Sequence, residues 1–136
     1  MSVTDTLEKL TAYRALVRTL EEREDMEEAA SRLWEDEARD SLRTLQAECH
    51  AIATSSGWWE SPRELGTLLA LVHSEVSEAL EAARKDDREE LAEELADVVI
   101  RVLDLAEHEG IDLADAVLAK MEKNRGRSHR HGGKTF

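Results

Sequence analysis

The sequence is poor in the residues that build sheets, disulfides and membrane spans. Aromatic residues make up only 4% of its 136 residues, and no stretch shows the apolar–polar alternation of an exposed strand. Cys49 is the only cysteine, which excludes an intramolecular disulfide, and its apolar helical neighbours predict a buried position. No apolar run approaches the roughly 20 residues of a membrane helix, and polar residues follow Met1. We therefore expect a cytoplasmic protein with no membrane partner.

Charged residues, by contrast, make up 36% of the chain and hydrophobic residues 41%, a composition typical of helices with a solvated surface. The length suits one domain with a core of its own. The formal net charge of −13 repels a nucleic-acid backbone, so we expect no nucleic-acid partner. A small phosphorylated ligand is still compatible with this charge where metal ions lie between the two.

Three helices are predicted after residue 60 from capping residues and from apolar residues at helical spacing. A capping residue followed three positions later by an acid occurs at Ser61, Asp87 and Asp112, and Gly110 predicts a helix end. The expected helices cover about residues 62–85, 88–109 and 112–126.

Residues 4–54 contain neither glycine nor proline. Two apolar stripes, from Leu10 to Leu20 and from Met26 to Ile52, are separated by charged residues. This pattern predicts two helices with a bend or break at 21–27, and one long helix is the alternative. The fold class is then an all-α bundle of four to five helices. We expect residues 1–40 to form a helical arm that serves oligomerisation and residues 41–136 to form the main helical domain with a basic C-terminal tail.

Two pairs of carboxylates stand out in the predicted helices 62–85 and 88–109. Glu75 and Glu78 lie three residues apart on the first, and Glu94 and Asp97 on the second, so each pair shares one helix face. At about 100° per residue, the four acids lie on the same rotational side of the two apolar stripes. Adjacent antiparallel helices can therefore turn all four toward one cleft beside the core.

Four carboxylates in one place repel one another unless cations neutralise them. Ligands that are all oxygen suit Mg²⁺ or Mn²⁺ rather than zinc. The alternative is a solvated acidic face, because Glu-x-x-Glu spacing also occurs at Glu21 and Glu24. The two pairs in the predicted cleft differ from that one in bordering strong apolar stripes, which favours a metal site.

At these residues the sequence resembles the MazG-like members of the all-α nucleoside triphosphate pyrophosphohydrolase superfamily. The resemblance covers roughly residues 43–136. It rests on Glu-x-x-Glu at 75–78, a spacer, and Glu-x-x-Asp at 94–97. Gly57-Trp58-Trp59 before the first pair and the basic run 120–134 after the second are also similar to the family.

The resemblance implies Mg²⁺-dependent hydrolysis of nucleoside triphosphates between the α and β phosphates, which yields a nucleoside monophosphate and pyrophosphate. A role in nucleotide-pool control or house-cleaning follows. Glu75, Glu78, Glu94 and Asp97 would be the metal ligands, and one of them would orient the attacking water. Substrate-binding groups would be Lys120, Asn124, Arg127, Trp59 and Arg130. Many relatives carry Lys-Tyr-Pro after the asparagine, whereas this chain has Arg127-Ser128-His129.

Several neighbouring residues have more than one interpretation. Trp58 and Trp59 can stack on a nucleobase or close the end of the bundle. Arg101, four residues after Asp97, is expected to pair with that carboxylate rather than to act in catalysis. His50 and His73 are interpreted as polar helix residues near the cleft.

Two other functions stay open at this point. A phosphoribosyl-ATP type of pyrophosphohydrolase would carry Tyr-His after the acidic Asp97, where this chain has Val98-Val99-Ile100. A non-catalytic helical adaptor with surface acids would show no Mg²⁺-dependent stabilisation.

The apolar stripes exceed what one short C-terminal helix can cover, so we expect a homodimer or homotetramer, as in relatives of the superfamily.

Overall fold

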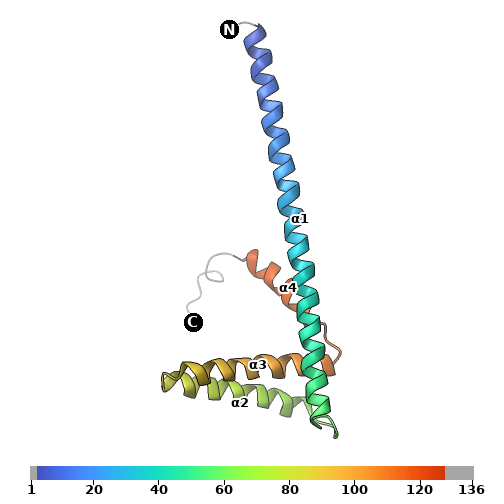
Figure 1. The fold of residues 1–136 in the computed structure, drawn as a ribbon, viewed down its shortest axis with the longest axis vertical. Helices are drawn as coiled ribbons and strands as arrows, with labels where there is room; N and C mark the ends of the chain where they lie inside the picture. Colours follow the sequence, from blue (N-terminus) through green and yellow to red (C-terminus); the bar gives the residue numbers. More distant parts are fainter. Residues whose placement is uncertain (1–2, 128–136) are drawn as a thin grey trace. The chain divides into compact units, whose positions relative to one another are not determined.

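The computed structural model describes residues 3–127, with side chains from residue 10 onward. Four helices follow one another, and the described residues contain no strand (Figure 1): α1 Val3–Ser55, α2 Leu65–Arg84, α3 Arg88–His108 and α4 Leu113–Arg125. This confirms the all-α prediction, with the smaller of the two expected helix numbers. No helix among these residues is long and apolar enough to cross a membrane.

The predicted break at 21–27 is wrong, because α1 continues through it as one helix. Its charged residues form ion pairs one turn apart, such as Arg18–Glu22 at 3.1 Å and Arg32–Glu28 at 3.4 Å. Such pairs and the high helix propensity of Glu and Arg hold a helix together where an apolar stripe is interrupted.

The chain divides into two units, residues 1–38 and 39–136, which we describe separately. In the first unit, none of the side chains from residue 10 onward is buried. The large apolar ones that are exposed are Leu10, Tyr13, Leu16, Leu20, Met26, Leu33 and Trp34. The second unit carries the last part of α1 together with α2, α3 and α4.

The start of α2 differs from the prediction at Ser61. The helix begins at Leu65, and the N-cap residue Glu64 makes no side-chain capping bond. The preceding residues are held by Arg63, whose Nε donates to the carbonyl of Trp58 at 2.8 Å. The guanidinium of Arg63 also lies 4.0 Å from the centre of the Trp58 ring. These contacts keep Pro62 to Glu64 outside the helix.

The helices α2 and α3 form a hairpin, and they lie side by side in Figure 1. The turn between them has Asp86 at a positive φ of 56°. Asp87 then caps α3, as predicted, by accepting the Glu90 amide at 3.0 Å. Ala79 and Ala82 are buried on α2, and Leu103 and Ala106 on α3. Small residues at such a contact let two helices approach closely.

The end of α1 is tied to the loop between α3 and α4. Gly110, at a φ of 66°, ends α3 as predicted. Asp112 caps α4 by accepting the Asp115 amide at 3.0 Å, and Arg43 of α1 donates to the same carboxylate through Nε at 2.9 Å. The buried Gln46 also bonds this loop. Cys49, one turn further along α1, is buried as expected.

A second apolar surface of the hairpin is not covered within the described chain. On α2 the residues Leu65, Leu69, Val76 and Leu80 are exposed, and on α3 Leu95 and Val99 are exposed. Their helical spacing makes a stripe on each helix. Large apolar side chains exposed in such stripes are typical of an interaction site.

Candidate metal and nucleotide site

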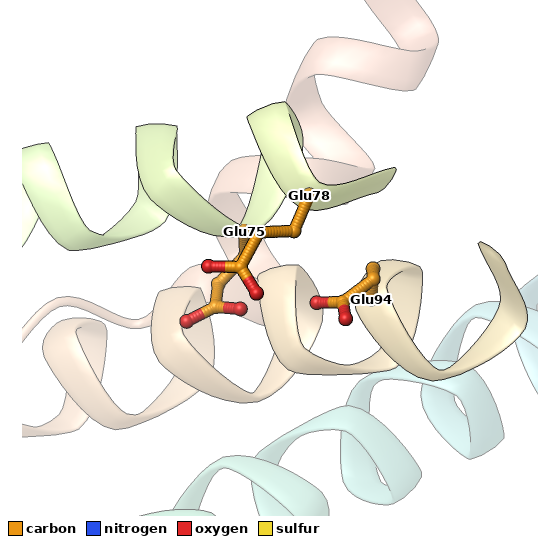
Figure 2. A group of neighbouring side chains, drawn as sticks. All are labelled: Glu75, Glu78 and Glu94. Atoms are coloured by element: carbon orange, nitrogen blue, oxygen red, sulfur yellow. The ribbon is translucent and has the colours of Figure 1, made fainter. Parts of the chain in front are cut away.

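Three glutamates from the hairpin come together. Glu75 and Glu78 extend from α2 toward α3, and Glu94 extends from α3 toward them (Figure 2). One carboxylate oxygen of each lies within 4.8 Å of the others. Glu75 is buried, Glu94 is half-buried and Glu78 is exposed. The group is therefore open on one side and fixed to the core on the other.

The electrostatics of this glutamate cluster (Glu75, Glu78, Glu94) favour a cation. The pKa of Glu94 is raised above its ordinary value, first by partial removal from water and then by the charges of Glu78 and Glu75. A hydrogen bond with Glu75 and the charge of Asp97 act in the same direction. A divalent cation among these oxygens would relieve the repulsion, and an all-carboxylate donor set suits Mg²⁺ or Mn²⁺.

Asp97, the fourth predicted ligand, does not lie within the glutamate cluster. It is exposed one turn after Glu94 on α3, and its charge still contributes to the raised pKa of Glu94. Asp97 borders an open depression of about 270 Å³, which is also lined by Ala53, Ser56, Trp58, Ile100, Arg101 and Asp104. The depression and the glutamate cluster are thus neighbours along α3.

Arg101 pairs differently from the sequence prediction. Its Nε donates to Oε1 of Glu75 on the neighbouring helix at 2.5 Å, and no ion pair between Arg101 and Asp97 is found. The i,i+4 spacing behind that prediction indicates only neighbours within one helix. The Glu75 carboxylate is buried, and a charge that is removed from water needs a partner more than an exposed one does.

The two tryptophans have distinct surroundings. Trp58 carries Arg63 on its ring and lines the depression. Trp59 stacks on His108, with ring centres 3.7 Å apart and planes 11° apart, and its Nε1 donates to Oδ1 of Asp104 at 2.9 Å. Both tryptophans are half-buried. Because His108 stacks on Trp59, one face of the Trp59 ring is already occupied by a side chain of the same protein.

Asp104 is a site residue that the sequence analysis missed. It is buried on α3, and His50 Nδ1 lies 2.7 Å from the same Oδ1 that Trp59 contacts. The signal was present, since a carboxylate stands between the apolar residues Leu103 and Leu105. A charge at such a position indicates a buried polar contact. His50 therefore belongs to this contact, whereas His73 is exposed on α2.

The predicted C-terminal binding residues lie on or after α4. Lys120 and Asn124 are exposed on α4, and Arg127 is exposed just beyond its end. Arg130 lies outside the described residues, as do His129 and the rest of the basic run after residue 127. Neither Lys120 nor Asn124 belongs to the glutamate cluster or lines the depression beside it.

Comparison with known families gives a match for this chain. A model described as the MazG nucleotide pyrophosphohydrolase domain matches residues 63–131, just over half of the chain. The match includes α2, α3, α4 and all four predicted metal ligands. No curated protein and no solved structure gives a significant match.

Proposed function

The chain belongs to the MazG nucleotide pyrophosphohydrolase family, and from this premise we propose that it hydrolyses nucleoside or deoxynucleoside triphosphates with Mg²⁺. The products are a nucleoside monophosphate and pyrophosphate. Nucleotide pyrophosphohydrolase activity in general follows from the family. The choice of magnesium, the triphosphate substrate and a role in nucleotide-pool control or house-cleaning are our proposal, and we place the reaction in the cytoplasm.

The glutamate cluster is the observation that carries this proposal. Three carboxylates within 4.8 Å of one another form an oxygen donor set with excess negative charge. Glu75, Glu78 and Glu94 would hold the ion, and Asp97, one turn away, would join them. When bound, Mg²⁺ or Mn²⁺ neutralises the carboxylates and polarises phosphate oxygens.

We assign the remaining chemistry to the four carboxylates and to side chains outside the glutamate cluster. One of the four carboxylates orients the attacking water, which needs an acceptor within hydrogen-bond reach. Lys120, Asn124 and Arg127 supply donors and positive charge for phosphate and sugar, as does Arg130. Trp59, whose ring already stacks on His108, would contact the nucleobase.

We also propose a homodimer or homotetramer. The exposed stripe of Leu65, Leu69, Val76 and Leu80 on α2, with Leu95 and Val99 on α3, is the surface that a second copy would cover. A closed symmetric pair buries the same patch on both chains. The arm of residues 1–40 would strengthen this contact rather than touch substrate.

Two substitutions test the metal ligands. Glu78→Gln and Glu94→Gln should each lower Mg²⁺-dependent pyrophosphate release by about 100-fold or more, because each removes a charged ligand. Circular dichroism should still show a folded helical protein. Release is measured over the eight common nucleoside and deoxynucleoside triphosphates.

The matched control is Glu81→Gln, since Glu81 lies on α2 but pairs with Arg84 at 2.8 Å outside the cluster. Its activity should stay within about twofold of the natural chain, because exposed pairs contribute little. Normal turnover in Glu78→Gln or Glu94→Gln would point to a different ligand set. Absence of turnover and of Mg²⁺-dependent stabilisation in the natural chain would favour a non-catalytic adaptor.

A further inference from the structure

Arg101 forms an ion pair with Glu75, a member of the glutamate cluster. Its guanidinium bonds Glu75, whose side chain is 8% exposed, while that of Arg101 is 31% exposed. Among the described residues, it is the basic side chain that pairs with a member of the cluster. Arg101 therefore supplies the positive charge that a buried carboxylate requires.

Arg101 is also one of the residues that line the depression next to the cluster. Its guanidinium lies 5.4 Å from the centre of the Trp58 ring, and Asp97 and Ile100 line the same depression. Arg101 thus stands between the proposed metal ligands and an open space beside Asp97. A guanidinium at such a position can bond a carboxylate on one side or phosphate oxygens on the other.

We propose that Arg101 is a counter-ion that is exchanged when a divalent cation and a polyphosphate bind together. This inference rests on the proposed function. Arg101 holds Glu75 while the metal is absent, which opposes binding of the metal alone. When a divalent cation and a polyphosphate are both bound, the Glu75 carboxylate would hold the cation, and the Arg101 guanidinium would turn to the phosphates in the depression.

The argument is one of charge and linkage. Two cations on one carboxylate repel each other, so a contact that stabilises the metal-free form lowers the affinity for the metal. A phosphate chain beside the released guanidinium offsets the loss of the Arg101–Glu75 contact, because it offers the guanidinium a new anionic partner. Arg101 therefore couples the two ligands, and it acts on Glu75 as a positioning residue.

The test measures two affinities of the full chain by titration calorimetry. In Arg101→Met, which keeps an unbranched aliphatic side chain but removes the guanidinium, the dissociation constant for Mg²⁺ alone should fall about three- to tenfold. The dissociation constant for inorganic tripolyphosphate at saturating Mg²⁺ should rise about tenfold, the value of one charge-assisted contact. A purely structural role for Arg101 cannot move the two constants in opposite directions.

Two further variants serve as controls. Arg63→Met removes the other guanidinium from Trp58 without touching the cluster, so its Mg²⁺ affinity should match that of the natural chain. Arg101→Lys keeps the charge without the fork of donors, and both constants should lie between those of the natural chain and Arg101→Met. Arg101→Lys also carries the test if Arg101→Met does not fold.

Weaker or unchanged Mg²⁺ binding in the folded Arg101 variants overturns the inference, even if the natural chain hydrolyses nucleotides normally. Unchanged tripolyphosphate binding overturns the exchange as well. Absence of hydrolysis for every triphosphate refutes the proposed function instead. In that case, opposite shifts of the two constants would still support the exchange of Arg101 between Glu75 and phosphate.

Discussion

Replacing Gln46 by leucine should loosen the loop between α3 and α4. Gln46 Nε2 donates to Oε2 of Glu107 at 2.8 Å and to the carbonyl of Ile111 at 2.9 Å. Its Oε1 accepts from the Leu113 amide at 3.3 Å. Gln46 is only 5% exposed, so water replaces these contacts poorly. One side chain of α1 thus fixes both ends of the loop that positions α4.

The size of the effect follows from the groups that lose their partner. Leucine has nearly the volume of glutamine but leaves the Ile111 carbonyl and the Leu113 amide unpaired, at about 1–3 kcal/mol for each group. Additional apolar burial offsets about 1 kcal/mol. Since the Leu113 bond is long, we expect the free energy of unfolding to fall by about 1–3 kcal/mol, or the melting temperature by about 4–12 °C.

Urea denaturation followed by circular dichroism measures this change, and hydrogen exchange locates it. Exchange of the Leu113 amide should accelerate together with the loss of stability. Glu48→Leu is the matched control, because Glu48 is exposed two positions further on the same helix, and it should stay within about 0.5 kcal/mol of the natural chain. Equal stability of Gln46→Leu and the natural chain would refute the reasoning.

Three further predictions concern charge and assembly. The Arg43 guanidinium lowers the pKa of Asp112 below its ordinary value of 3.8. The stability that this pair provides is present above pH 3.8 and is lost as the pH falls through the lowered pKa. In a profile of melting temperature against pH, Arg43→Gln should therefore lose less stability on the acid side than the natural chain. Because the pKa of Glu94 is raised above 4.5, ionisation of Glu94 destabilises the fold as the pH rises when no metal is bound. In EDTA at neutral pH, Glu94→Gln should therefore have a higher melting temperature than the natural chain. At saturating Mg²⁺ the natural chain should have the higher melting temperature. Light scattering should give at least a dimeric mass for the full chain and a weaker assembly for a chain that starts at Ser41; a monomeric full chain contradicts the proposed assembly.

Local signals predicted the parts of the fold that depend on neighbours in sequence. The caps at Asp87 and Asp112 and the end at Gly110 were confirmed, because each involves backbone groups within a few residues. The start at Ser61 was wrong because Arg63 contacts Trp58 through its long side chain. No capping pattern contains that contact.

The candidate site shows the same division between local and tertiary information. Helical spacing alone puts Glu75 and Glu78 on one face. Glu94 comes within ligand distance of Glu75 and Glu78, whereas Asp97 does not. This difference depends on the axial register of α2 against α3. The turn at Asp86 and the close contact at Ala82 determine this register, and neither is encoded in the acidic motif.

The pattern of partners along α3 argues for where a cation belongs. Glu94, Asp97, Arg101 and Asp104 follow one another at intervals of three or four residues, so they lie along one face of the helix. At one end of this row Asp104 has His50 and Trp59 as partners, and in the middle Arg101 has Glu75. At the other end, no ion pair with a described residue is found for Glu94 or Asp97, and Glu78 has only a hydroxyl contact with Ser74 at 3.3 Å. The negative charge is therefore uncompensated beside Glu94, and a bound cation would complete the row there rather than near Asp104.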